Sequence, residues 1–92
     1  MPKYRKKPVI IDAYQFNNRV GTDDRPDWIK AAAEEGQVKV VIPRAAPAYM
    51  LIPTLEGEMR ADTDDWIIRG VKGELYPCKP DIFAATYDFV EA

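Results

Sequence analysis

The chain has 92 residues, a formal net charge of −2 and a single cysteine. This length predicts one domain over residues 1–92, and the near-neutral charge excludes a general attraction to nucleic acid or to an anionic membrane. A lone cysteine cannot form an internal disulfide, which is typical of a cytoplasmic protein.

The sequence contains no histidine. This excludes Ser-His-Asp and Cys-His catalysis, and with one cysteine it leaves no ligand set for structural zinc. Asp62, Asp64 and Asp65 offer oxygen ligands, but they lack the glycine and distal glutamate of a calcium loop, so we interpret them as a solvated turn. We expect no cofactor.

Residues 3–7 are basic, but no apolar run of signal-peptide type follows them, and no stretch approaches the roughly 20 apolar residues of a membrane span. We therefore expect a cytoplasmic protein that does not contact a membrane.

Residues 9–16 have the alternation of a strand, with Ile10, Tyr14 and Phe16 on one face. Both faces are partly apolar, which predicts a central position in a sheet. The polar residues 17–24 are expected to form a loop.

A helix is predicted over residues 26–35. Pro26 suits the first turn of a helix, and Asp23 or Asp24 is available to cap it. Gly36 is expected to end the helix, because glycine readily takes the left-handed conformation found there.

The next segments alternate between strands and interruptions. Residues 37–42 form a valine-rich strand, residues 43–48 a proline-containing loop, and residues 49–52 a strand that Pro53 places near an edge or a bulge. A tight hairpin turn at Glu56-Gly57 follows. The pairs predicted across this hairpin are Thr54 with Met59 and Ile52 with Ala61.

The last third of the chain predicts a turn over residues 62–65, a strand over 66–69, a second glycine-bounded turn over 70–73, a short helix over about 80–86 and a closing strand over 87–90. The fold class is therefore α+β, with a small, mostly antiparallel sheet of about five to seven strands, arranged as a meander or barrel-like, and one main helix across it. Five residues are predicted to be buried: Ile11, Trp28, Ile29, Ile67 and Phe83.

Three segments also resemble a known group. YRKKPVIIDAYQF at residues 4–16, TLEGEMRA at 54–61 and DWIIRGVKGELYPCKPDIF at 65–83 resemble segments of small phage and prophage proteins of uncharacterised function. The resemblance covers both ends and about half the chain, and it implies a phage accessory protein in a bacterial host cell without implying an activity. Those proteins often have glycine before the Asp-Trp pair, where this chain has Asp64, which tolerates a positive φ less well.

A basic run at Arg5, Lys6 and Lys7 lies beside a strand that offers Tyr14 and Gln15. One interpretation is the rim of a pocket for phosphate or another anion. The alternative is a solvated terminus that keeps an edge strand from pairing.

The second hairpin adds Arg69, Tyr76 and Lys79, which are candidates for stacking and charge on the same ligand. Trp66 is a candidate platform for a base, against the alternative of a core anchor. The Lys79 ammonium lowers the pKa of Cys78 if the two groups interact, against the alternative of an inert structural thiol.

The favoured function is a non-catalytic binding module that sequesters a small anionic ligand. In its most specific form, this hypothesis identifies the ligand as a nucleotide-like defence signal of the host. One alternative is an inhibitor that covers a host protein surface through residues 49–51 and the preceding loop. A second is a histidine-independent phosphodiesterase, with acid–base pairs drawn from Glu56, Glu58, Glu74 and Asp81.

The many short strands leave sheet edges exposed, which predicts a homodimer or higher homo-oligomer. Residues 49–52 or 87–90 are expected to provide the pairing edge. The shared groove would combine Arg5 and Lys7 of one copy with Tyr76 or Lys79 of either copy.

Overall fold

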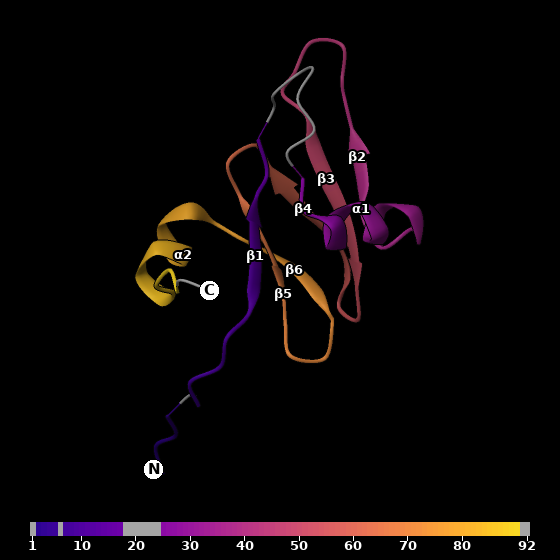
Figure 1. Cartoon of the computed structure of the whole chain (residues 1–92). Helices are drawn as coiled ribbons and strands as arrows, with labels where there is room; N and C mark the ends of the chain where they lie inside the picture. Colours follow the sequence, from indigo (N-terminus) through magenta and orange to yellow (C-terminus); the bar gives the residue numbers. More distant parts are fainter. Residues whose placement is uncertain (1, 6, 18–24, 91–92) are drawn as a thin grey trace.

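The computed structural model describes residues 2–5, 7–17 and 25–90, and these form two three-stranded antiparallel sheets and two helices (Figure 1). One sheet has the order β1-β5-β6 and the other β2-β3-β4. The α+β class with mostly antiparallel pairing is thereby confirmed. In chain order the elements are β1 (Asp12–Gln15), α1 (Asp27–Glu34), β2 (Lys39–Val41), β3 (Tyr49–Thr54), β4 (Gly57–Asp62), β5 (Trp66–Arg69), β6 (Leu75–Cys78) and α2 (Pro80–Thr86).

Helix α1 ends as its sequence predicts. Gly36 has φ +79°, its N–H donates to the Ala33 carbonyl at 3.2 Å, and the Gln37 N–H donates to the Ala32 carbonyl at 2.8 Å. These two bonds satisfy carbonyls that a helix end leaves unpaired. At the other end Pro26 takes an extended conformation just before the helix. The predicted caps Asp23 and Asp24 lie outside the described residues.

The β3–β4 hairpin has a different register from the predicted one. Thr54 pairs with Gly57 and Ile52 with Met59, so the predicted pairs were wrong by two positions. The Thr54 hydroxyl accepts a hydrogen bond from the Glu56 N–H at 3.2 Å and donates to the Gly57 carbonyl at 2.6 Å. These bonds place Leu55 and Glu56 in the turn, and Gly57, with φ +108°, begins β4.

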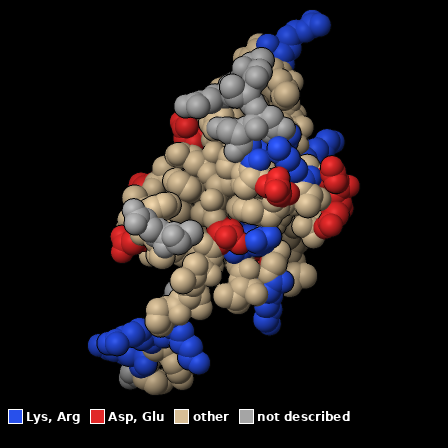
Figure 2. Space-filling view, viewed as in Figure 1, with Lys and Arg blue, Asp and Glu red and all other residues tan. Residues whose placement is uncertain are grey.

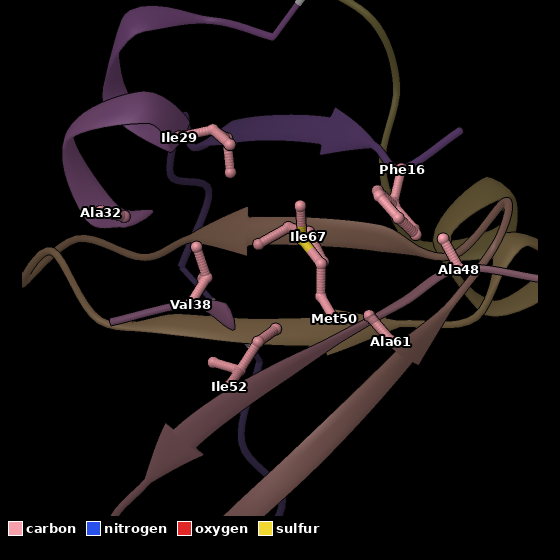
Figure 3. Close-up of a cluster of buried hydrophobic side chains, with 9 residues drawn as sticks. All are labelled: Phe16, Ile29, Ala32, Val38, Ala48, Met50, Ile52, Ala61 and Ile67. Atoms are coloured by element: carbon pink, nitrogen blue, oxygen red, sulfur yellow. The ribbon is translucent and has the colours of Figure 1, made fainter. Parts of the chain in front are cut away.

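The core lies between the two sheets and is covered on one side by α1 (Figure 3). Ile29 and Ile67 are fully buried, as predicted, whereas Ile11, Trp28 and Phe83 are only half-buried. Phe83 is not in the core because α2 lies on the outer face of the β1-β5-β6 sheet. The fully enclosed cluster consists of Phe16, Ile29, Ala32, Val38, Ala48, Met50, Ile52, Ala61 and Ile67.

Strand β1 is shorter than predicted and lies at a sheet edge, not in the centre. Its partner β5 has four residues, so pairing begins where Asp12 meets Arg69, and Gly70 already belongs to the next turn. Residues 9–11 therefore precede the ladder, and Ile10 remains 81% exposed.

The predicted pairing edges were also wrong. Strand β3 is the central strand of its sheet, and Pro53 is accommodated because β2 pairs only with residues 49–51. Residues 87–90 form no strand: the Tyr87 ring packs against Phe83 at 5.1 Å between centroids, and Phe89 is 91% exposed. The edges of the two sheets are instead β1 and β6, and β2 and β4.

Candidate functional site

Helix α2 covers the outer face of the β1-β5-β6 sheet with aromatic side chains. Trp66 and Tyr76 point to this face, because side chains alternate along a strand and Ile67 points to the core. The Trp66 and Phe83 rings stack with centroids 4.0 Å apart and planes 7° apart. One face of the Trp66 indole is thus occupied by a side chain of the same chain, which is how a packing anchor is held.

Tyr76 lies in the same aromatic layer, and its hydroxyl oxygen is 3.5 Å from that of Tyr87. Burial raises the pKa of Tyr76 to about 12, and the hydrogen bond with Tyr87 and the charge of Glu74 act in the same direction. Tyr76 therefore stays neutral at physiological pH and offers a ring and a hydroxyl, but no charge.

The Lys79 ammonium donates to two carboxylates, at 2.8 Å to Asp65 and 3.3 Å to Asp62. Asp65 is only 4% exposed and also accepts the Asp62 N–H at 2.8 Å. The hydrogen bond to Asp65 is the main reason that the pKa of Lys79 is raised. The Lys79 charge is thus used within the fold, where it holds the start of α2 against the turn before β5.

Arg69 is committed in a similar way. Its guanidinium forms a salt bridge with the Asp12 carboxylate, and its central carbon lies 5.1 Å from the centroid of the Trp28 ring. On the other sheet, Arg60 donates to Asp62 at 2.6 Å, and this hydrogen bond is the main cause of the lowered pKa of Asp62.

The N-terminal candidates lie apart from the second hairpin. Arg5 and Lys7 are exposed, and Figure 2 shows Lys and Arg atoms gathered on the segment that leaves the body of the molecule at lower left. Lys6 lies outside the described residues. Gln15 donates to the Asp64 carbonyl at 3.0 Å, and Tyr14 packs against the core on the opposite face of β1.

The Cys78 thiol is half-buried, and burial is the main reason that its pKa is raised, with the Asp65 and Asp81 charges adding to the effect. Lys79 does not reverse this shift, because its ammonium is hydrogen-bonded to Asp65 and Asp62. The geometry therefore favours the structural interpretation of this thiol over the reactive one.

A cavity that the sequence analysis missed lies between the ends of the two hairpins and the loop after α1. Its volume is about 570 Å³. The lining combines turn residues from segments that are distant in sequence, so no local motif marks it. In the sequence, Leu55 beside the Glu56-Gly57 turn was a signal for this site, and the structure leaves both Leu55 and Met59 exposed. The apolar residues of the lining include Pro53, Leu55, Met59 and Leu75, and Tyr76 also borders the cavity.

The charged groups of this cavity are both carboxylates, Glu56 and Glu74. Neither a lysine nor an arginine is among the described residues that line it. Glu74 also accepts the Lys72 N–H at 2.9 Å, which holds its carboxylate at the second hairpin turn. Such a cavity favours an apolar group, with or without an adjoining positive charge, and disfavours an anion.

Over the described ranges, no cluster of three or more His, Cys, Asp or Glu residues is arranged to hold a metal ion. Within those same ranges no helix has the length and apolar character needed to cross a membrane. No family model, no curated protein and no solved structure matches the chain. The resemblance to phage and prophage proteins therefore stays a prediction from the sequence.

Proposed function

We propose that the chain is a small non-catalytic binding module, of phage or prophage origin as its sequence resemblance implies, that covers a host protein surface. The observation that carries this proposal is the 570 Å³ cavity, whose lining is apolar with two carboxylates. Volumes of roughly 300–1,000 Å³ are typical of binding sites that take a buried group. We infer that a partner inserts an apolar side chain there and places a basic residue next to it.

The charge distribution supports a protein partner over a nucleotide-like one. A phosphate group in the cavity would lie beside Glu56 and Glu74, and like charges in a partly desolvated site repel. Of the cations predicted to meet such a ligand, Arg69 and Lys79 are bound to carboxylates of the fold. Sequestration of a nucleotide would have to break these pairs or rely on the N-terminal cations alone.

The mouth of the cavity also suits a protein surface. Leu55 is fully exposed at the tip of the β3–β4 hairpin, and Met59 is partly exposed beside it. Methionine adapts its shape to irregular apolar partners, and an exposed leucine gains free energy when a partner removes it from water.

The test is a pull-down from a bacterial host lysate with the immobilised chain and two variants. Leu55→Asp places a charge at the cavity mouth, and Val71→Asp makes the same change at an exposed apolar residue of the other hairpin turn, outside the cavity. We expect one stoichiometric protein partner, retained by the wild type and by Val71→Asp and lost with Leu55→Asp.

Calorimetric titration with linear and cyclic nucleotides provides the opposing measurement, and we expect no saturable heat. Retention of the partner by Leu55→Asp, or saturable nucleotide binding that this variant leaves unchanged, would contradict the cavity as the binding site.

A further inference from the structure

The N-terminal segment, described at residues 2–5 and 7–11, forms an arm outside the two sheets. It leaves β1 and runs beyond the end of the β5–β6 hairpin (Figure 1). Tyr4 is 92% exposed and Ile10 81% exposed, so two large apolar side chains of the arm have no cover in the single chain. The arm thus exposes apolar surface that a folded partner would remove from water.

The arm combines large apolar side chains with cations at neighbouring positions. Successive positions of an extended chain lie on opposite sides, and the even positions of this segment are Tyr4, Lys6, Pro8 and Ile10 in the sequence. The odd positions include the cations Lys3, Arg5 and Lys7. Apolar side chains with cations next to them are the ligand chemistry that the cavity between the hairpins favours.

The charges of the arm and of the rest of the chain are opposite. Four of the 13 lysines and arginines lie within positions 3–7, which leaves nine against 15 acidic residues, a net charge of −6 for the remainder. Glu56 and Glu74 place part of this negative charge on the cavity itself. Long-range attraction therefore brings the arm toward the body, and short-range pairing favours the cavity.

The strand order separates the arm from the cavity of its own chain. The arm continues from β1, whereas the cavity contains Leu75 and Tyr76 of β6, and these strands form opposite edges of one sheet. A second copy can present its cavity without the arm having to fold back across β5. This geometry favours exchange between chains over closure within one chain.

We propose that the arm of one copy docks in the cavity of a second copy, with Tyr4 and Ile10 against Leu55 and Met59 and the arm cations toward Glu56 and Glu74. Tyr4 to Ile10 spans about 20 Å in an extended chain, enough to cross the cavity mouth. Reciprocal exchange fills both cavities and closes a two-fold dimer. The proposal rests on the proposed function to the extent that the same cavity binds polypeptide, and it makes the arm a competitor of the host protein.

The test uses light scattering at micromolar concentration on the full chain and on two charge variants. The cavity variant is Leu55→Lys/Glu56→Lys and the arm variant is Lys3→Glu/Arg5→Glu/Lys7→Glu. We expect a wild-type mass of about 21 kDa, twice the 10.5 kDa of one chain. In each variant alone the dissociation constant should rise roughly tenfold or more, because the exchanged contacts become repulsive.

Mixing the two variants restores the contacts, since each arm then meets a cavity of opposite charge. We expect the equimolar mixture to form a heterodimer of wild-type mass, which also shows that both variants are folded. Controls that reverse one charge outside the cavity and the arm, Glu58→Lys and Lys39→Glu, should remain dimeric. About 0.5 M sodium chloride should weaken the wild-type dimer by screening its charges.

A wild-type chain that stays monomeric, a variant that dimerises alone as the wild type does, or a mixture that fails to associate would overturn arm exchange. These outcomes leave the lysate experiment independent. If the wild-type chain is monomeric and Leu55→Asp loses the host partner, the result supports the proposed function without the exchange. If the chain dimerises but Leu55→Asp still retains the host partner, the result supports the exchange without the proposed function.

Discussion

The Lys79 ammonium lies between two carboxylates, 2.8 Å from the buried Asp65 and 3.3 Å from Asp62. A buried carboxylate is costly unless it is paired and hydrogen-bonded, and Asp65 receives both Lys79 and the Asp62 N–H. Lys79 was a candidate ligand contact in the sequence, but in the fold its charge stabilises the buried Asp65 carboxylate.

The ionisation of Tyr76 should make the stability of the fold depend on pH in the alkaline range. Its pKa is raised to about 12, mainly by burial, whereas the unfolded chain ionises this group near its ordinary value of 10. Between these values the unfolded state binds fewer protons than the folded state, so stability falls as pH rises from 10 to 12. We expect this loss to be smaller in Tyr76→Phe, measured by urea unfolding at a series of alkaline pH values.

The raised pKa of Lys79 also removes stability at alkaline pH, so the comparison with Tyr76→Phe isolates the tyrosine. Tyr87→Phe removes the hydroxyl partner and should lower the pH at which Tyr76 ionises, followed by absorbance at 295 nm. An alkaline stability loss of equal size in the wild type and in Tyr76→Phe would contradict this account.

The turn between β4 and β5 shows how one element depends on one dihedral angle. Asp64 has φ +77°, its N–H donates to the Phe16 carbonyl at 2.7 Å, and the Asp65 carbonyl accepts the Phe16 N–H at 2.9 Å. The turn is thereby fixed to the chain after β1. A left-handed conformation is unfavourable for a residue with a Cβ and is open to glycine.

We expect Asp64→Gly to stabilise the chain by up to about 1 kcal/mol, the strain released minus the extra entropy of glycine in the unfolded state. Asp64→Ala should destabilise it, because alanine keeps the strain without the local hydrogen bonding available to aspartate. The measurement is the midpoint of urea unfolding. A lower midpoint for the glycine variant would show that the Asp64 side chain contributes more than its backbone strain costs.

Helix α2 is another element whose attachment depends on few contacts. No residue of α2 is fully buried, and its main anchor is the Phe83 ring stacked on Trp66. We expect Phe83→Ala to cost about 2–3 kcal/mol of unfolding free energy, since it removes the stack and uncovers Trp66. The change should also shift the tryptophan fluorescence to longer wavelength.

Phe83→Leu serves as the matched variant, because it keeps an apolar group over Trp66 but loses the stacked ring. It should cost less than the alanine variant. Equal stability of the wild type and Phe83→Ala would mean that α2 contributes nothing to the folding of the sheets.

At the scale of the whole molecule, the chain separates its charges. The basic arm extends from one edge of the β1-β5-β6 sheet, and the body carries a net charge of −6. The apolar cavity with its two carboxylates lies at the opposite edge, where β6 meets the β3–β4 hairpin. The proposed self-association and the proposed host binding would therefore use one cavity in competition, and the light-scattering and lysate experiments distinguish the two proposals.

Local signals in the sequence determined the bounds of several elements. Pro26 and Gly36 bracket α1, the glycines at 70 and 73 bracket the β5–β6 turn, and Pro80 begins α2, because each acts within a few residues through φ, capping or a missing donor. The α+β class follows from the same signals.

The tertiary structure alone decided the arrangement and the candidate site. It divided the strands between two sheets, paired Lys79 with Asp65 and formed a cavity from turns about twenty residues apart in sequence. The sequence placed Arg5, Lys7, Tyr76 and Lys79 around one ligand, whereas the fold holds Lys79 in an ion pair and leaves the arm outside the sheets. Such features depend on strand register and on contacts between distant residues, which hydrophobic alternation and turn chemistry do not specify.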